Sequence, residues 1–429
     1  MSESQVRQST DGRARAVFTG IGVMAPNGTG TEDWWAATLA GKSGIDTVRS
    51  FDARSYPSQL AGEIKDFDPG ERLSARIVVE TSRMSHFALA ATRMALDDAT
   101  VDLSKIPEYE LGVITANASG GAEFGQRELQ KLWRGGPKDV SPYMSIAWFY
   151  AATTGQISIG HGMRGPCGVM VSEQAGGLDA LGQARRVVRD GTRLVVTGGS
   201  DSSLSPAGFV SQLPTGNLTP VNDPARAYLP FDTDASGFVP GEGGAILVLE
   251  NADTARERGV DHPYGELAGY AATFDPRPGS GRPPTLTRCV REALVDARMR
   301  PEDIDVVFAD GHGTAEMDRQ ESRTLAEVFG PRAVPVTVPK TMTGRLYAGA
   351  GALDTAGALL ALRDQVVPPT VHVKNPADTH ELDLVIDQPR EIELRTAMVI
   401  ARGHGGFNAV AIVRLTDRHI RTTTVKTEA

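Results

Sequence analysis

The stretch VMVSEQAGGLDALGQARRVVRD, residues 169–190, has the arrangement in which many folded chains hold a nucleophile. A short apolar strand runs into a sharp turn of small residues, and a helix begins near Gln174. Unpaired N–H groups and the positive end of the helix dipole would stabilise an anion at that turn. An amide is not a nucleophile, so the stretch predicts the geometry of such a site without its reactive group. The pattern alone also fits a plain strand that enters a helix.

Neighbouring residues offer weaker candidates for chemistry. Ser172 lies beside the turn but has no adjacent base in the sequence, and Cys167 is interpreted as a packed thiol. His161 and His404 have no second His or Cys at metal-ligand spacing, so no metal site is assigned. The Gly clusters GEGG and ASGG lack the strand, GxGxxG and acidic residue of a dinucleotide site, so no nucleotide cofactor is expected.

The elements that would position these residues alternate along the chain. Short β-branched runs bounded by Gly or Asp predict buried strands at Ala16–Phe18, Leu111–Thr115, Leu194–Thr197, Ala245–Leu249, Val306–Ala309 and Met398–Ala401. Segments of helical period lie at Thr81–Asp98, Ala122–Trp133, Gln174–Arg189, Leu286–Ala297 and Asp318–Val328. This alternation predicts a layered α/β architecture with parallel strands.

An internal repeat indicates that the architecture is duplicated. The segment ALDDA at 95–99 recurs as ALVDA at 293–297, and each copy precedes an acidic loop, a strand and a Gly-rich loop. We therefore expect an N-terminal half at 14–256 and a C-terminal half at 257–416. Residues 1–13 and 417–429 are expected to form flexible tails.

Composition limits the partners and the compartment. The 429 residues include 44 Lys plus Arg, 53 Asp plus Glu and two cysteines, for a formal charge of −9. This balance argues against nucleic acid, and no run reaches the roughly 18 apolar residues of a membrane helix. With no signal-like apolar stretch at the N-terminus, the chain is expected to be cytoplasmic. An acidic partner would need a local basic patch; Arg185, Arg186 and Arg189 cluster on one helix but are interpreted as a solvated face.

Several motifs together resemble the β-ketoacyl synthases. These are VFTGIGVMAPNG, PFDTDASGFVPGEGGAILVLE, DGHGTAEMDRQE, PKTMTGRLYAGAG and ARGHGGFNA, in the family's order and over nearly the whole chain. SEQAGG, TANASGGAEFGQRELQKLW and AWFYAATTGQISIGHGMRGP resemble the chain length factors in particular, the ketosynthase β subunits of bacterial type II aromatic polyketide synthases. The resemblance implies a thiolase-type fold, in which two duplicated halves are layered α-β-α-β-α.

The resemblance also implies that the reactive positions are degenerate. Gln174 stands at the position of the catalytic Cys, His312 at that of the first His, and Arg345 where the second His is expected. Lys340 of the same motif is retained, and Gly405, Gly406 and Phe407 form the Gly-rich turn near the site. No catalytic residue is therefore expected in this chain. His312 is either a structural relic or a residual contributor to thioester or carboxylate binding.

A subunit of this kind would pair with the catalytic ketosynthase α subunit and shape the interface tunnel that limits the poly-β-keto chain. Ala122 and Leu129, two helical turns apart, match positions that often carry bulky aromatics in the family, and both are smaller here. With Gly125, Leu132 and Trp133 they form the expected chain-length gate, and their size favours a long product. The alternative is that Ala122 and Leu129 are ordinary core residues.

Two other functions stay open on the sequence. One is a decarboxylase that makes the primer from malonyl carrier protein through a Gln-for-Cys site, although Arg345 argues against it. The other is a self-contained synthase that uses Ser172 or Cys167. No cofactor is expected on the chain itself, because phosphopantetheine would arrive on the acyl carrier protein.

Overall fold

The computed structural model describes residues 14–277 and 279–416. The predicted tails, 1–13 and 417–429, lie outside the described residues. Within the described part of the chain, no helix is long and apolar enough to span a lipid bilayer.

Two sets of strands repeat one topology. The first set is β1 (Ala16–Ala25), β5 (Leu111–Ala116), β6 (Cys167–Met170), β7 (Leu194–Asp201) and β8 (Gly243–Asn251), in the spatial order β1-β8-β7-β5-β6. The second set is β9 (Gly265–Phe274), β10 (Val306–Phe308), β11 (Pro335–Thr337), β15 (Thr396–Gly403) and β16 (Phe407–Arg414), in the order β9-β16-β15-β10-β11. Strands of the same rank along the chain take the same place in each set. The predicted duplication is therefore present in the fold.

The strand directions are mixed, which corrects the expectation of parallel strands. Parallel pairing is confined to the outer strands, where β5 pairs with β6 and β7, and β10 pairs with β11 and β15. The strands between them, β7-β8-β1 and β15-β16-β9, pair antiparallel, and β1 meets β9 at Val17 and Phe18. Continuous apolar runs report burial on both faces of a sheet and say nothing of direction, so the sequence could not reveal this.

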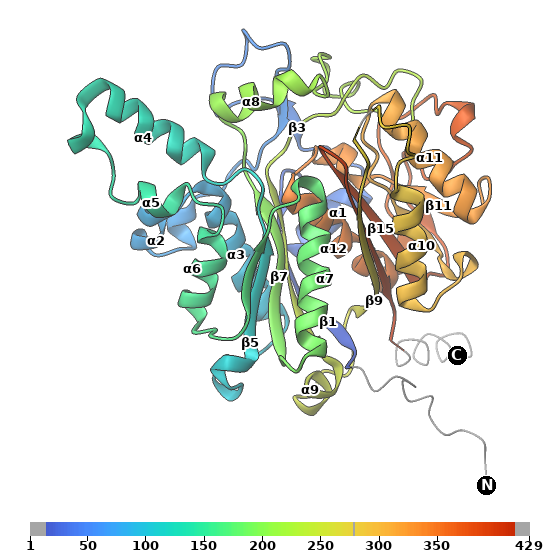
Figure 1. Ribbon diagram of the computed structural model, residues 1–429, viewed down its shortest axis with the longest axis horizontal. Coiled ribbons are helices and arrows are strands. Elements are labelled where there is room, and N and C mark those ends of the chain that lie inside the picture. The colour runs from blue at the N-terminus through green and yellow to red at the C-terminus, as the bar shows by residue number, and fades with distance from the viewer. Residues whose placement is uncertain (1–13, 278, 417–429) are drawn as a thin grey trace.

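Helices fill three layers around the two sets of strands. The middle layer holds α7 (Gly176–Arg189) and α12 (Ala348–Asp364), which contact each other and both sets. The outer layers hold α3 (Arg83–Asp98) with α6 (Ala152–His161) on one side, and α10 (Leu286–Ala297) with α11 (Ala315–Phe329) on the other. Figure 1 shows the five α-β-α-β-α layers from α6 on the left to α10 on the right. This is the predicted thiolase-type arrangement.

Small residues allow the middle layer to pack closely. Residues 348–362 of α12 are all buried, so this helix has no polar face. A Cβ on Gly349 would lie 2.1 Å from the Gly243 carbonyl oxygen, and one on Gly177 would lie 2.7 Å from that of Ala348. The abundance of Gly thus follows from backbone contacts between the central helices and the strands.

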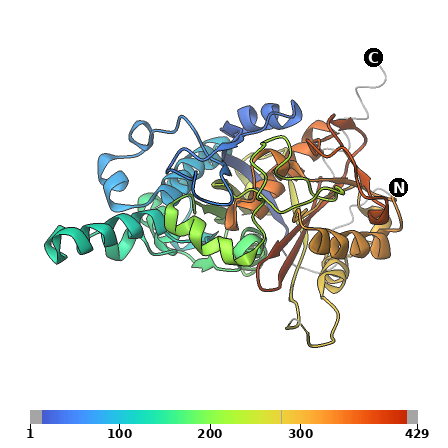
Figure 2. The same cartoon turned by 90° about the horizontal axis from the view of Figure 1, so that it is seen from above.

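One part of the molecule extends away from this core. Helix α4 (Ala122–Gly135) projects beyond the body in both views, and the short α5 (Met144–Ala147) follows it in the chain (Figures 1 and 2). The remaining elements are the helices α1 (Thr31–Leu39), α2 (Ala75–Glu80), α8 (Pro206–Gln212) and α9 (Ala252–Glu257), and the short strands β2 (Gly28–Thr29), β3 (Ile45–Thr47), β4 (Leu60–Gly62), β12 (Val366–Val367), β13 (Asp383–Leu384) and β14 (Arg390–Glu391).

Candidate functional site

The sharp turn predicted before α7 is present. Strand β6 ends at Met170, a 3-10 turn covers Glu173–Ala175, and α7 begins at Gly176. Glu173 has a φ of 53°, an unusual value for a non-glycine residue, and it turns the chain sharply enough to bring Gln174 to the helix N-terminus. Gln174 is 1% exposed. The geometry of a nucleophile site is retained, with an amide in the reactive position.

The Gln174 amide is held by two groups of the segment before α12. In the amide orientation that satisfies both neighbours, its oxygen accepts a hydrogen bond from Arg345 Nε at 3.2 Å, and its nitrogen donates to the Tyr347 carbonyl at 3.2 Å. Tyr347 itself has a φ of 50° at the start of α12. Gln174 therefore links the α7 turn to a strained residue at the start of the other central helix.

Arg345 uses every one of its guanidinium donors inside the protein. Both of its Nη atoms bond the Asp310 carboxylate at 3.0 Å, and they also reach the carbonyl oxygens of Asp310 and Arg402. Burial alone would raise the pKa of Asp310, but the cations Arg345 and Lys340 outweigh it and hold that pKa below its ordinary value. The residue at the expected second His position is thus half of a buried, fully bonded ion pair.

His312 lies beside this pair as a neutral imidazole. It is 7% exposed, its Nδ1 is 3.0 Å from the Thr314 hydroxyl, and its ring meets Phe238 edge to face with centroids 5.3 Å apart. Burial, reinforced by the Arg345 charge, lowers the pKa of His312 to about 3. The ring is therefore neutral near pH 7.

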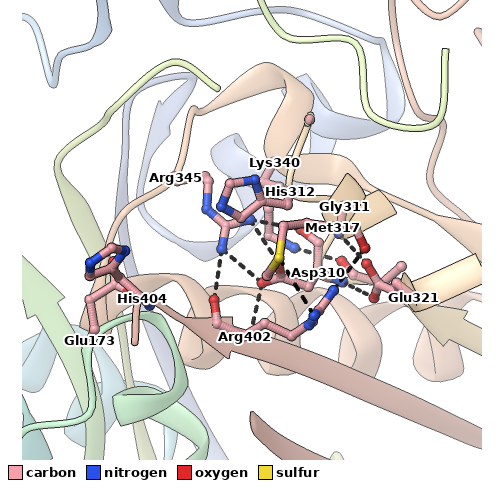
Figure 3. A network of polar contacts seen from close by, with 12 residues as sticks. Glu173, Asp310, Gly311, His312, Met317, Glu321, Lys340, Arg345, Arg402 and His404 are labelled. Atoms are coloured by element: carbon pink, nitrogen blue, oxygen red, sulfur yellow. Dashed lines mark hydrogen bonds and ion pairs between the residues drawn. The ribbon is translucent and has the colours of Figure 1, made fainter. Parts of the chain in front are cut away.

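Two more cations complete the buried network drawn in Figure 3. Lys340 Nζ donates to the Ala309 carbonyl and pairs with Asp354, both at 2.7 Å. The guanidinium of Arg402 donates to the Met317 carbonyl at 2.8 Å and to Gln320 at 2.9 Å. Lys340 thereby links the residue after β10 to α12, and Arg402 links β15 to α11.

A cavity of about 260 Å³ opens beside this network. Its walls come from both halves of the chain: Ala118, Ser119, Glu173, Ser203, Ser211, Gln212, Thr215, Asn217, Phe238, His312, Arg345, Tyr347, Arg402 and His404. Burial raises the pKa of the Glu173 carboxyl, which accepts a hydrogen bond from the backbone N–H of His404 at 2.7 Å. Of the predicted site residues, His312 and Arg345 line this cavity, whereas Gln174 and Lys340 do not.

The Gly-rich turn lies close to the same place. Gly405 and Gly406 have φ values of 87° and 113°, and the turn joins β15 to β16. Phe407 packs edge to face on Phe274 with centroids 4.9 Å apart. The preceding His404 is exposed at the cavity.

The predicted gate residues lie elsewhere, on the projecting α4. Leu129 is 46% exposed and Trp133 81% exposed, while Gly125 is buried against Trp148 and Met144. Ala122 and Leu132 are partly exposed. None of the five lines the cavity at His312. Because Leu129 is not buried in this chain, the interpretation of Leu129 as a core residue is wrong.

Two other interpretations from the sequence are also corrected. Cys167 is exposed on the edge strand β6 and is not packed, because that strand pairs on one side only among the described residues. Arg185 is buried and ion-paired with Asp296, so it is not part of a solvated face. The Ser172 hydroxyl, which has no adjacent base in the sequence, donates to Asp179, which also accepts from Tyr270.

Sequence reasoning missed the residues that hold the site together. Asp310, Arg402, Glu173 and Tyr347 were not singled out, although Asp310 and Arg402 begin the motifs DGHGT and RGHGG. Within residues 14–277 and 279–416, no group of three or more His, Cys, Asp or Glu side chains could hold a metal ion.

Two family descriptions match the chain. Beta-ketoacyl synthase, N-terminal domain, matches residues 14–255, and Beta-ketoacyl synthase, C-terminal domain, matches residues 264–374. Together they span more than half of the chain. The chain belongs to the β-ketoacyl synthase family.

Similar sequences assign the chain to one type of subunit within this family. It is 58% identical to the tetracenomycin polyketide synthase ketoacyl synthase beta subunit of Streptomyces glaucescens, over 94% of this chain and 98% of that one. It is 54% identical to the actinorhodin polyketide putative beta-ketoacyl synthase 2 of Streptomyces coelicolor, over 93% and 98%. The prediction of a ketosynthase β subunit, or chain length factor, of a type II polyketide synthase is confirmed.

Solved structures agree with this assignment. The ishigamide ketosynthase/chain length factor matches with a TM-score of 0.87 and 28% identity, over 94% of this chain and 100% of that one. A second match, with a TM-score of 0.86 and 29% identity over the same shares, is a type II acyl-carrier protein in complex with its ketosynthase bound to the hexaketide, AntDE:AntF.

Proposed function

We propose that this chain pairs with a catalytic ketosynthase α subunit and forms one wall of the tunnel that limits the length of a poly-β-keto chain. The observation that carries the proposal is the bonded state of Gln174. A side chain that cannot attack a thioester is fixed at the nucleophile position by Arg345 and Tyr347. Bond formation must then come from another subunit, and this chain contributes shape.

An exposed apolar surface supports the pairing. We call it the α4–β6 surface; it consists of Leu129, Trp133, Ile146, Trp148, Phe149, Tyr150, Ile159 and Val171, each at least 39% exposed. Its residues lie on α4, α5, α6, the segment 148–150 and directly after β6, the edge strand of the first set, which has no strand neighbour on its outer side among the described residues. A long apolar patch at an open sheet edge is typical of an obligate subunit interface.

The position of helix α4 supports the proposal that its residues form the chain-length gate. Exposed Leu129 and Trp133 on a helix that projects from the body would reach the partner and line space between the subunits (Figures 1 and 2). Ala122 and Gly125, at the start of the same helix, add little bulk there. We propose that these small side chains leave room for a long product, because a bulkier wall would make each further extension cost overpacking.

The substrate would arrive on an acyl carrier protein. A solved relative holds such a carrier in complex with its ketosynthase, and we propose that the same class of partner serves this complex, with phosphopantetheine carried by that partner. The cation that corresponds to a second His, Arg345, has no free donor and no lone pair to accept a proton. The alternative, a malonyl decarboxylase, is therefore not favoured.

Reconstitution tests the proposal. The chain is co-expressed with the α-type ketosynthase of a type II polyketide synthase, supplied with carrier protein and a malonyl donor, and the products are sized by mass spectrometry. The pair is expected to make a long polyketide, and this chain alone is expected to make none and to release no CO₂. Release of CO₂ with acetyl carrier protein from this chain alone would overturn the proposal in favour of the decarboxylase.

A further inference from the structure

A second, larger pocket lies between α2, α3, α4 and the segments that follow β4 and β7. It shares no lining residue with the cavity beside His312, and the three helices lie on the left of Figure 1. Its volume of about 750 Å³ is within the roughly 300–1,000 Å³ of small-molecule sites. Most of its lining side chains carry hydroxyl, amide or charged groups. The pocket therefore suits a polar ligand.

Two helices begin at the wall of this pocket. The first turns of α3 and α4 both line it. A Cβ placed on Gly121, the residue before α4, would lie 2.9 Å from the Ser82 Cβ, so the two helix starts are in contact. Among the described residues, the backbone N–H groups of 83–85 and 122–124 have no hydrogen-bond partner. The positive ends of two helix dipoles thus meet at one place, which favours an anion.

Two side chains at the start of α3 are buried without a partner. Ser82 is 3% exposed and His86 is 8% exposed, and both line the pocket. Within the described residues, the Ser82 hydroxyl does not cap the helix, and neither Ser82 Oγ nor His86 Nε2 forms a hydrogen bond. Their spacing of four residues places them on one face of the helix. Polar atoms are rarely buried without a partner, so this pair points to a polar ligand at the start of α3.

Two further side chains of the wall have donors to spare. Arg83 uses Nε and Nη2 for the Glu242 carboxylate and the Ile64 carbonyl. Its Nη1 makes no hydrogen bond among the described residues, and the side chain is 35% exposed. Gln126 accepts from the Ala207 N–H through Oε1, which leaves its amide N–H groups available in the same part of the chain. The wall at the start of α3 is therefore rich in donors.

The carboxylates of the pocket do not oppose an anion at this place. Glu63 is buried and accepts two backbone N–H groups. Glu123 pairs with a cation one turn further along α4, and Asp66 is exposed. The cations on the wall other than Arg83 pair with Asp46 or Glu123. The charge with a free donor at the start of α3 is thus positive.

We propose that this pocket binds a phosphate group, as the free ion or as the phosphate ester of a small polar molecule. The phosphate would lie where α3 and α4 begin, with Ser82 Oγ and Arg83 Nη1 donating to it and His86 beside it. A phosphate offers oxygens in several directions, which matches donors from two helix starts and a guanidinium. The bound group would link α3 to the start of α4, which carries the proposed gate. The site would exist whether or not the chain pairs with an α subunit.

Titration of the full chain tests the site. Inorganic phosphate, ribose 5-phosphate and ribose are each added at neutral pH and constant ionic strength, and the ¹⁵N resonances of the His86 ring are followed. Loss of these resonances in His86→Gln identifies them. Both phosphates should shift them with a Kd of about 1 mM or lower, whereas ribose and NaCl should not. Tighter binding of ribose 5-phosphate would identify an ester as the ligand, and equal binding the free ion; either supports the proposal.

Variants at the start of α3 separate ligand binding from a structural role. Ser82→Ala removes a hydroxyl without a described partner, so stability in the absence of phosphate should not fall, while phosphate affinity should drop about tenfold. Ser82→Asp supplies a carboxylate to the helix start, so it should raise the unfolding temperature without phosphate and abolish phosphate binding. Asn251→Asp is the matched control, because it adds the same charge before α9 and does not line the pocket.

Three results would overturn the proposal. The first is that neither phosphate shifts the His86 resonances of the parent chain. The second is that NaCl or ribose shifts them as much as phosphate does. The third is that both Ser82 variants bind phosphate as tightly as the parent and the Asn251→Asp control.

Discussion

At the scale of single residues, the loss of the nucleophile is only part of what separates this chain from a working ketosynthase. Arg345 and Asp310 form a buried ion pair where the second His is expected, and His312 is neutral because burial lowers its pKa to about 3. Gln174 is bonded to this arrangement. Several residues, and not the nucleophile position alone, therefore differ from what condensation requires.

A single reversion should accordingly fail to restore condensation. The change is Gln174→Cys in a complex whose α subunit has its own nucleophilic cysteine replaced by alanine. No polyketide is expected, because loss of CO₂ from a malonyl unit leaves an enolate that needs hydrogen-bond donors, and the donors of Arg345 are already bonded within the protein. Mass spectrometry of the products checks this. The control is Gln174→Cys with an intact α subunit, which should keep its product; polyketide from the blocked complex would contradict the argument.

His86 gives the stability a pH dependence. Burial lowers the pKa of His86 to about 4, whereas the residue in the unfolded chain titrates near 6.5. Between these values the unfolded state binds the proton and the folded state does not, so stability falls as the pH drops from about 6.5 to 4. The loss reaches about 3 kcal/mol at most.

Urea unfolding at several pH values measures this contribution. The parent should lose stability between pH 6.5 and 4.5 more steeply than His86→Gln, since the other titrating groups are common to both proteins. Parallel curves for the two proteins would show that His86 is not protonated on unfolding in this range.

The sequence revealed the site positions better than their chemistry. Gln174, His312, Arg345 and Lys340 were identified because each lies in a short motif with fixed spacing. Their bonding partners could not be identified from the sequence. Asp310 and Arg345 are 35 residues apart in the chain, and Gln174 bonds to Arg345 where the starts of two helices come together. Pairing of this kind is tertiary and leaves no local pattern.

At the scale of elements, periodicity predicted the strands and helices well and the strand directions badly. The predicted helix at Leu286–Ala297 is α10, and the predicted strand at Leu194–Thr197 is the first half of β7. Both outcomes have one cause. Burial determines periodicity, whereas the direction of a strand depends on the connection that leads to it.

The central helices should not tolerate added bulk. Gly349→Ala would place a Cβ 2.1 Å from the Gly243 carbonyl oxygen, a backbone atom that cannot rotate away. We expect a loss of about 1–3 kcal/mol or more in the free energy of unfolding, measured in urea. The control is Gly160→Ala on α6, where nothing lies within 4 Å and a gain of up to about 1 kcal/mol is expected. Equal effects would mean that α12 is not held by this contact.

Helix α4 carries the prediction about product length. Ala122→Phe fills the proposed gate and should shorten the main product by at least one extender unit, because the wall moves into the tunnel. Arg127→Phe is the matched control, since Arg127 is exposed on another face of the same helix. Mass spectrometry of the reconstituted pair reads the length. An unchanged length with Ala122→Phe, or the same shortening with Arg127→Phe, would count against the gate.

At the scale of the whole molecule, the duplicated fold leaves one edge of the first set of strands open. Each half contributes one set of strands, and the two sets meet through β1 and β9 at the centre. The outermost strand of the first set, β6, has no further strand neighbour within the described residues, and Val171 of the α4–β6 surface directly follows it. A fold built from two similar halves therefore presents an apolar edge that a third and fourth half, in a partner subunit, would cover.

The last prediction concerns this surface. Phe149→Glu places a charge among stacked aromatics, since Phe149 lies 4.7 Å from Tyr150 and 6.3 Å from Trp148 between ring centroids. Burying that charge without a partner is costly, so the affinity for the α subunit should fall at least about tenfold. Val295→Glu is the matched control, because Val295 is 76% exposed on α10, on the opposite side of the molecule (Figure 1). Analytical ultracentrifugation of the mixed subunits distinguishes the two variants. If both bind equally well, the interface lies elsewhere, and α4 would project into solvent and have no part in the tunnel.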